Sequence, residues 1–153
     1  MRAIVLITIL CLVTGVCMAE EITNVWVACQ PDSFVNIREF PSKKADVVAR
    51  IEAGEMLETD GKKKGHWLHC FYPCETGEGW IKEDFVFYDE PVILEHGNYE
   101  VTKDNVIARY SKGGRIRKKL MKGRRVHVYL LGQDWSVTSQ GFIKTEFLMW
   151  LDI

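Results

Sequence analysis

The chain has few of the residue patterns that catalysis or metal binding requires. Its four histidines, at positions 66, 69, 96 and 127, are scattered, and no serine or cysteine lies in a nucleophile-elbow or papain-like context. The Cys-x-x-Cys spacing of redox proteins is also absent. These absences predict a protein that is not an enzyme and that holds neither a metal ion nor another cofactor.

Sustained helical periodicity is missing as well. No segment after residue 19 keeps apolar side chains at helical spacing over more than about two turns. Short runs rich in β-branched residues occur instead, as in 25–29, 33–37 and 47–51, and Gly, Pro, Asp and Ser bound them. Many short strands with frequent turns predict an all-β protein built from small barrels.

The chain has a single long apolar run, and it lies at the N-terminus. Residues 3–16 carry no charge, Arg2 precedes them, and Cys17-Met18-Ala19 places small residues at the two positions that a signal peptidase reads. We therefore expect residues 1–19 to be a signal peptide, cleaved after Ala19, and the remainder to be secreted, periplasmic or held at the cell surface. An uncleaved anchor is the alternative and would be the chain's contact with a membrane, although the run falls short of the about 20 apolar residues that span one.

The remaining sequence contains an internal repeat. Residues 79–86 read Gly-aromatic-Ile-Lys-x-acid-Phe-aliphatic, and residues 141–148 read the same. Three further blocks keep their order, because Arg38, Gly54 and Trp67 have counterparts in Arg109, Gly123 and Trp135. The repeat predicts two small domains, 20–90 and 91–153, joined near residues 89–91. Units of this size are marginally stable alone, so we expect them to pack together.

A signature in the first copy resembles that of a known family. Residues 36–42, Asn-Ile-Arg-Glu-Phe-Pro-Ser, resemble the Asn-aliphatic-Arg-x-x-Pro-Ser signature of bacterial SH3 domains, and the similarity extends over about residues 23–88. The second copy is degenerate, since Ile107 replaces the asparagine and Ser111-Lys112-Gly113 stands in place of Pro-Ser. The resemblance implies two tandem SH3-like barrels. It also implies a non-catalytic binding module that tethers to cell-wall peptidoglycan or to a surface or secreted protein.

The same resemblance implies a shallow aromatic groove on each barrel. The positions that match the groove of the wider SH3 family are Trp67, Lys82 and Phe85 in the first copy and Trp135, Lys144 and Phe147 in the second. A place in the core is the alternative for the aromatic residues, above all for the two phenylalanines, which lie in an alternating apolar block. Arg38 and Arg109 are expected to order a loop rather than to touch a ligand.

The segment GHWLHCFYPCETGEGW, residues 65–80, holds two histidines and two cysteines. Between its tryptophan and the glycine of the repeated block it is six residues longer than the second copy, which predicts a hairpin with strands at 67–72 and from 79 and a turn at 73–78. A zinc site typically needs about four ligands, but on a strand His66 and His69 point to opposite faces and the second copy offers no matching pair, so we expect a variable hairpin tip rather than a metal site. For Cys29, Cys70 and Cys74, one disulfide and three thiols both remain open, with Cys29 expected to point inward.

Charge is divided unevenly between the two copies. Residues 20–90 carry 8 Lys/Arg and 15 Asp/Glu, a net −7, whereas residues 91–153 carry 11 and 6, a net +5. Segment 112–125 holds eight cationic residues and no acidic one: Lys112, Arg115, Arg117, Lys118, Lys119, Lys122, Arg124 and Arg125.

The alternative function is therefore an electrostatic adaptor or a self-associating structural protein. It would bind an anionic polymer, a membrane surface or an acidic protein. Nucleic acid is not expected, because the protein is predicted to be exported and its pI is 6.4. In the simplest case the segment is a solvated strand pair, whose buried side would be Ile116, Leu120, Val126 and Val128.

Overall fold

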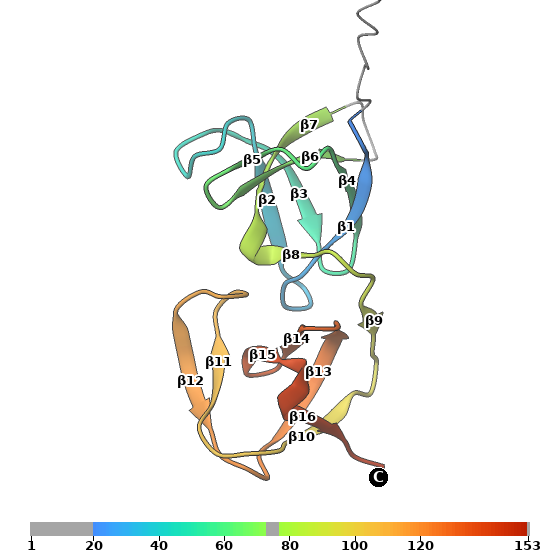
Figure 1. Cartoon of the computed structure of the whole chain (residues 1–153), viewed down its shortest axis with the longest axis vertical. Helices are drawn as coiled ribbons and strands as arrows, with labels where there is room; N and C mark the ends of the chain where they lie inside the picture. Colours follow the sequence, from blue (N-terminus) through green and yellow to red (C-terminus); the bar gives the residue numbers. More distant parts are fainter. Residues whose placement is uncertain (1–19, 73–76, 153) are drawn as a thin grey trace, which may run out of the picture.

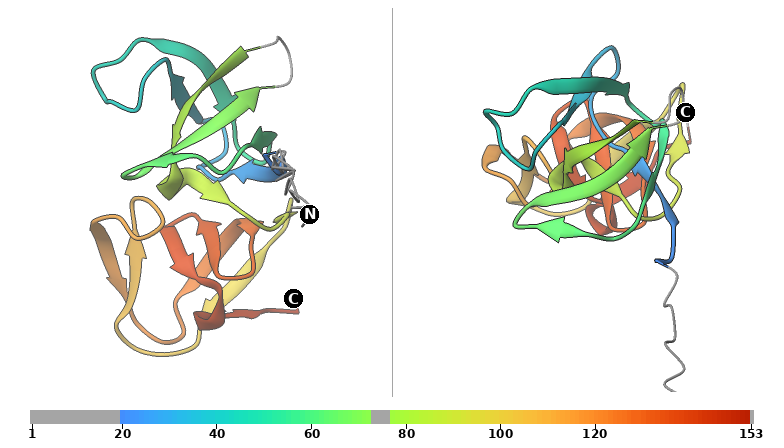
Figure 2. Two further views of the ribbon diagram at one scale, coloured as in Figure 1. Left: turned by 45° about the horizontal axis from the view of Figure 1, so that its top comes forward. Right: turned by 90° about the horizontal axis from the view of Figure 1, so that it is seen from above.

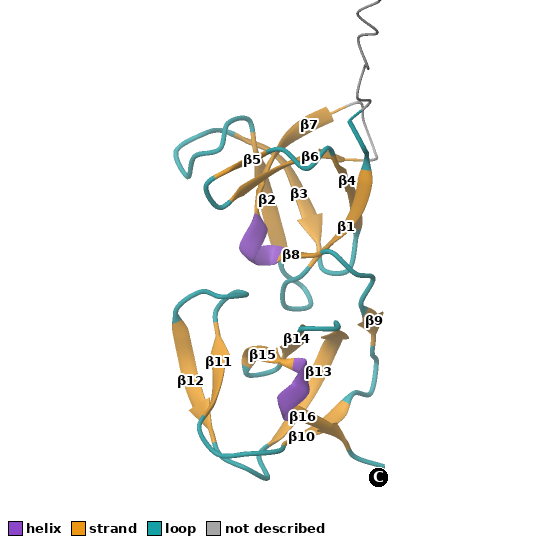
Figure 3. Cartoon of the chain, in the orientation of Figure 1, coloured by secondary structure: helices purple, strands orange, loops and turns teal. Residues whose placement is uncertain are grey.

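A computed structural model describes residues 20–72 and 77–152 of the chain. The predicted signal peptide and Cys74 lie outside these ranges. Apart from two 3-10 turns the ordered elements are all strands (Figures 1 and 3). The first half contains β1 (Thr23–Val27), β2 (Phe34–Arg38), β3 (Val47–Glu52), β4 (Met56–Thr59), β5 (Lys63–Lys64), β6 (Trp67–Tyr72), β7 (Gly77–Lys82), η1 (Glu83–Phe85) and β8 (Val86–Phe87). The second half contains β9 (Val92–Ile93), β10 (Asn98–Val101), β11 (Val106–Arg109), β12 (Ile116–Leu120), β13 (Arg125–Leu131), β14 (Trp135–Thr138), β15 (Gly141–Lys144), η2 (Thr145–Phe147) and β16 (Leu148–Trp150).

The two halves have the same topology. The first sheet has the strand order β3-β2-β7-β6-β4-β1-β8, and the second has the order β12-β11-β15-β14-β13-β10-β16, with every pairing antiparallel. Each strand of one path has a counterpart at the same place in the other. The all-β prediction of two small barrels is confirmed, and so is the internal repeat.

Alternation of side chains along the strands builds one core inside each barrel. In β13 every second residue is buried: Val126 and Val128 lie in the core of the second barrel, and Leu130, beyond a register shift, lies in a separate cluster described below. β6 alternates in the same way, with Leu68 and Cys70 fully buried. Because side chains of a strand point to opposite faces in turn, this period of two separates a packed inner face from an outer face.

The two barrels lie one above the other in the left view of Figure 2, and buried side chains of both form a third apolar cluster. Its buried members are Ala28 and Phe87 from the first barrel and Leu130, Val137 and Phe142 from the second. Phe142 packs edge to face against Phe87, with ring centroids 6.4 Å apart. The barrels therefore share a continuous apolar seam, as expected for two units that are small by themselves.

The predicted β6–β7 hairpin is confirmed. β6 has the predicted bounds, whereas β7 begins at Gly77, two residues earlier than expected, and Tyr72 pairs with Gly77. Cys29 and Cys70 are buried thiols in the first core, so the inward position of Cys29 is confirmed. Within residues 20–72 and 77–152, no helix has the length and apolar character that crossing a membrane would require.

Candidate functional site: two aromatic grooves

A cross-strand pair places tryptophan beside lysine on the outer face of each barrel. In the β6–β7 ladder Trp67 lies directly opposite Lys82, and in the β14–β15 ladder Trp135 lies directly opposite Lys144. The lysine Nζ atoms lie 5.8 Å and 4.9 Å from the centroids of the respective tryptophan rings. Both distances are within the range of a cation–π interaction. The repeat thus reproduces the geometry of the pair as well as its sequence.

A 3-10 turn then brings the phenylalanine to the same place. η1 and η2 follow β7 and β15 directly, and each ends in the predicted phenylalanine. Phe85 and Phe147 are half-buried: one side of each packs on a core cluster, and the other side lines a groove. Each phenylalanine side chain therefore contacts the core and also lines the groove, so both alternatives that the sequence left open hold for these residues.

Groove 1 is the hollow around Trp67, Lys82 and Phe85, with a volume of about 490 Å³. The first barrel also contributes Phe34 to its wall. The second barrel contributes Tyr110 and Phe142, so groove 1 opens at the seam between the barrels. Phe142 contacts Phe85 edge to face, with centroids 6.2 Å apart.

Groove 2 is the corresponding hollow around Trp135, Lys144 and Phe147, with a volume of about 340 Å³. It is lined by second-barrel residues alone. The Nζ atom of Lys103 lies 4.0 Å from the centroid of the Phe147 ring and partly covers it. Groove 2 is accordingly smaller and has less accessible aromatic surface than groove 1.

The charges that line groove 1 have one sign. Arg38, Lys43 and Lys82 are among its lining residues, and none of the lining residues is acidic. This contrasts with the net −7 of residues 20–90. A cationic hollow in an acidic barrel favours a ligand that carries carboxylate or other anionic groups.

One buried polar atom of groove 1 has no partner among the described residues. The side-chain oxygen Oδ1 of Asn36 is buried and accepts no hydrogen bond there. Asn36 belongs to the signature of the first copy, and the equivalent residue of the second copy is the apolar Ile107 in the wall of groove 2. Since buried polar groups are normally hydrogen-bonded, this position distinguishes the two grooves chemically.

The two arginines of the repeat hold loops, as predicted, but they also line the grooves, Arg38 in groove 1 and Arg109 in groove 2. Arg38 Nη1 donates a hydrogen bond of 2.7 Å to the carbonyl oxygen of Ala45, and Arg109 Nη1 donates one of 2.6 Å to that of Gly114. Gly79 and Gly141 lie beside these arginines. A Cβ atom there would come within 2.9 Å of Arg38 O and 2.5 Å of Arg109 O, so the close strand approach requires glycine.

A further hollow at the seam, with a volume of about 620 Å³, is lined by acidic residues rather than by Lys and Arg. It shares Phe34 with groove 1, but Asp32, Glu52 and Glu95 line it. None of the six predicted groove residues lines this hollow. Although this hollow is larger than groove 1, its size alone does not make it the better candidate for the ligand-binding site.

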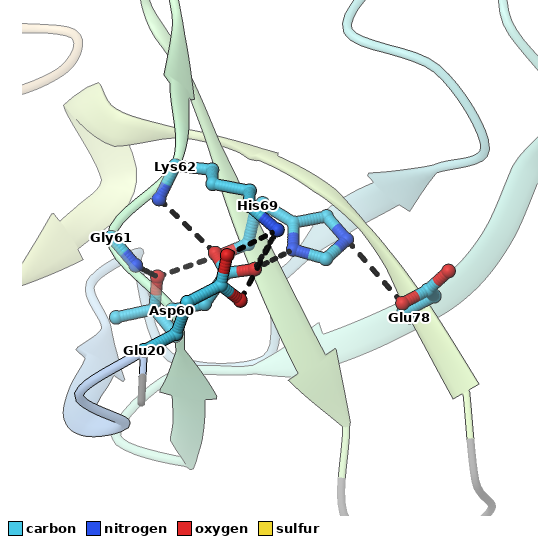
Figure 4. Close-up of polar contacts among 7 residues, drawn as sticks. Glu20, Asp60, Gly61, Lys62, His69 and Glu78 are labelled. Carbon is cyan, nitrogen blue, oxygen red and sulfur yellow. Dashed lines mark hydrogen bonds and ion pairs between the residues drawn. The ribbon is translucent and has the colours of Figure 1, made fainter. Parts of the chain in front are cut away.

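The histidines of the β6–β7 hairpin take no part in either groove. His69 Nδ1 lies 2.8 Å from Asp60 Oδ2, and its Nε2 lies 3.6 Å from Glu78 Oε2 (Figure 4). The ring also packs against Trp80, with centroids 5.0 Å apart. His66 is exposed just before β6. Among residues 20–72 and 77–152 no group of three or more His, Cys, Asp or Glu side chains is placed to hold a metal ion.

Both described cysteines are poor nucleophiles. Burial, with a smaller contribution from the charge of Glu52, raises the pKa of Cys29 to about 11. Burial, with a smaller contribution from Asp60, raises the pKa of Cys70 to about 12. Since the thiolate is the reactive form, neither side chain is suited to nucleophilic or redox chemistry near neutral pH.

The structure corrects two expectations for segment 112–125. Lys112 is not free for a polyanion, because its Nζ donates a 2.6 Å hydrogen bond to Val86 O in the first barrel. The lysine is half-buried, and this burial lowers its pKa despite the nearby carboxylates of Glu83 and Asp84. Ile116 is not on the buried side, because β12 lies at the sheet edge and leaves it 50% exposed, whereas Leu120, Val126 and Val128 are buried as expected.

The three residues predicted for each groove lie together in the structure, but the sequence did not indicate several other residues that line groove 1. Phe34, Lys43, Tyr110 and Phe142 line groove 1 and were not among the predicted site residues. Phe142 occupies the aromatic position of the repeated block, and this was the one feature of the sequence that could have indicated it as a site residue. Nothing in the local sequence indicates that Tyr110 and Phe142 reach a groove of the other barrel.

No protein-family model matches the chain, and no curated protein matches it. Among solved structures, the chain is similar to NlpC1 from Trichomonas vaginalis, with 12% identity, a TM-score of 0.39, and coverage of 88% of this chain and 48% of that one. It is also similar to NlpC2 from the same organism, with 11% identity, a TM-score of 0.38, and coverage of 87% and 49%. The chain spans about half the length of these two proteins.

Proposed function

We propose that the chain is a binding protein that recognises an extended, carboxylate-bearing peptide through groove 1, and that the peptide is that of cell-wall peptidoglycan. The supporting observation is that Trp67, Phe85 and Tyr110 line one hollow together with Arg38, Lys43 and Lys82, while no acidic side chain lines it. Aromatic rings offer apolar area at low conformational cost, and the cationic side chains match carboxylates.

The chemistry of the lining residues supports the proposal of binding rather than catalysis. Groove 1 has no histidine or carboxylate that could act as a general base, and its cysteine, Cys29, is held as a thiol by its raised pKa. Activation of a nucleophile requires such a neighbour or a lowered pKa. The second barrel supports recognition in this proposal by supplying Tyr110 and Phe142 to the wall.

Co-sedimentation of the protein with purified cell-wall sacculi tests the proposal. The wild-type protein should pellet with sacculi at low salt and, because aromatic contacts are not screened, should still pellet in part at about 0.5 M salt. Trp67→Ala removes a half-buried ring at the centre of groove 1. Loss of such an anchor costs about 2 kcal/mol or more, so the affinity should fall by about 30-fold.

Trp80→Ala is the matched control. Trp80 lies on the outer face of the same hairpin, is also half-buried, and does not line groove 1. Its removal should leave pelleting unchanged. Pelleting of Trp67→Ala to the wild-type extent would refute the groove as the binding site. Absence of wild-type pelleting at both salt concentrations would exclude the wall peptide and leave a protein as the ligand.

A further inference from the structure

A strongly basic surface lies on the second barrel, and none of its cationic side chains lines groove 1 or groove 2. It consists of β12, the turns that flank it and the first residue of β13, and we call it the β12 face. Seven exposed cationic side chains make up the β12 face: Arg115, Arg117, Lys118, Lys119, Lys122, Arg124 and Arg125. Residues 115–125 contain no acidic residue, so nothing within the segment offsets these charges.

No carboxylate of the described residues forms an ion pair with these side chains, although Glu100 lies opposite Arg125 in the β10–β13 ladder and Asp104 Oδ1 accepts a hydrogen bond from Lys122 N. The ion pairs among the described residues involve Lys62, Lys63 and His69 as the basic partners, all in the first barrel. None of the seven cationic side chains of the β12 face forms one. Close packing of seven like charges that form no ion pair is unfavourable in the free protein, and an anionic ligand would relieve it.

Protection of a sheet edge does not account for this composition. β12 ends its sheet, and charged residues on an edge strand do discourage pairing with another chain. However, β3 holds the same edge position in the first barrel. It has one cationic residue, Arg50, and exposes Val47 and Val48. The fold therefore tolerates this edge without a row of cations.

Two of the arginines are pre-arranged around one aromatic ring. The guanidinium carbon atoms of Arg115 and Arg117 lie 4.7 Å and 5.8 Å from the centroid of the Tyr110 ring. The turn beneath them is fixed, because Tyr110 N donates to Arg115 O at 3.2 Å and Arg109 Nη1 donates to Gly114 O at 2.6 Å. Stacked guanidinium groups keep their planar N–H forks free, and ordering them beforehand reduces the entropy cost of binding.

We infer that the β12 face binds a linear phosphate-bearing polymer and that Arg115 and Arg117, stacked on Tyr110, grip one of its phosphates. Four of the seven cationic side chains are arginines, whose fork matches two oxygens of a phosphate. Exposed cationic side chains follow one another along the strand and its flanking residues, at Arg115, Arg117, Lys118, Lys119, Lys122, Arg124 and Arg125. This row suits a chain of successive charges better than it suits a single ion. The site adjoins groove 1 through Tyr110, but none of its cationic side chains lines that groove, and the inference does not depend on the proposed function.

Calorimetric titration of the full-length protein with long-chain inorganic polyphosphate tests the inference. Wild-type protein should bind at 50 mM salt and lose affinity steeply towards 200 mM salt, as expected when counterions are released. R115Q/R117Q should weaken binding at least tenfold. It should also reduce the slope of log affinity against log salt by about 1.4, at about 0.7 per lost phosphate contact. R115K/R117K keeps both charges, so it should keep the slope and still lose several-fold in affinity.

The matched control is K118Q/K119Q, which removes two charges from the same exposed strand without touching Tyr110. It should weaken binding at least fivefold less than R115Q/R117Q does. Equal losses in the two variants would overturn the arginine grip, and absence of wild-type binding at 50 mM salt would overturn the site.

Equally tight binding of poly-glutamate of the same charge would overturn the assignment to phosphate. Binding to vesicles of anionic lipid but not to polyphosphate would overturn the polymer as ligand. All the substituted side chains are exposed, and thermal denaturation verifies that each variant is folded.

Discussion

Replacing Phe142 with alanine removes the ring at the centre of the seam between the barrels. Phe142 is 2% exposed and packs edge to face against Phe85 and Phe87 of the other barrel. Truncation of a buried phenylalanine costs about 3–5 kcal/mol, of which each aromatic pair accounts for about 0.5–1.5 kcal/mol. This is a large part of the about 5–15 kcal/mol that stabilises a typical domain. For a chain of this length it corresponds to a melting temperature lower by about 10–15 °C.

The assay is equilibrium unfolding in urea, followed by tryptophan fluorescence and by far-UV circular dichroism. The wild-type protein should unfold in one transition by both probes, because the shared seam couples the barrels. In Phe142→Ala the transition midpoint should fall. The barrel that depends more on the seam should then unfold first, so that the two probes no longer coincide.

Trp80→Ala provides the control, because Trp80 holds the equivalent place in the first barrel. Its ring is half-buried on the outer face of β7 and contacts His69 rather than the seam. This substitution should cost about 1–2 kcal/mol and leave a single transition. A loss of less than about 1 kcal/mol in Phe142→Ala would refute the reasoning that the seam stabilises both barrels. Equal losses in the two variants would refute it as well.

Two further predictions concern ionisable groups of the first barrel. Burial of the Asp60 carboxyl opposes its ionisation, but hydrogen bonds from the backbone N–H of Lys62 and from His69 outweigh this effect, so the pKa of Asp60 is lowered. The unfolded chain, with an Asp pKa near about 3.9, therefore binds the proton more readily than the folded protein does. The stability contributed by Asp60 should be complete above about pH 5 and lost as the pH falls through its folded pKa. Acid unfolding of Asp60→Asn should show a shallower pH dependence, and an unchanged profile would contradict the assignment. The raised pKa values of Cys29 and Cys70 predict that iodoacetamide at pH 8 leaves both thiols unmodified until denaturant is added. Peptide mass spectrometry measures this, and labelling of either residue in the native protein would show that the thiol is accessible and ionised.

Much of the fold could be predicted because its determinants are local. The repeated block Gly-aromatic-Ile-Lys encodes a strand whose glycine permits close approach to β2 or β11 and whose isoleucine, Ile81 or Ile143, is fully buried. The lysine that follows pairs with a tryptophan across a hairpin, and hairpin register depends on nearby residues. The three members of each predicted groove therefore lie together, as the sequence indicates.

Long-range packing decided the rest. The sequence places Lys112 in a row of cations, but the approach of the barrels turns its side chain to Val86 O. It places Ile116 in an apolar alternation, but the strand lies at a sheet edge with nothing to cover it.

The sequence by itself determined two copies of one small β-barrel, the pairing of tryptophan with lysine in each, and the separation of charge between them. Only the tertiary structure decided that the grooves are unequal. Tyr110 and Phe142 of the second barrel complete the groove of the first, whereas the second groove is formed by its own barrel alone. The physical reason is that strand period and turn chemistry act over a few residues. Burial at the seam, in contrast, depends on how two separately encoded apolar surfaces fit together.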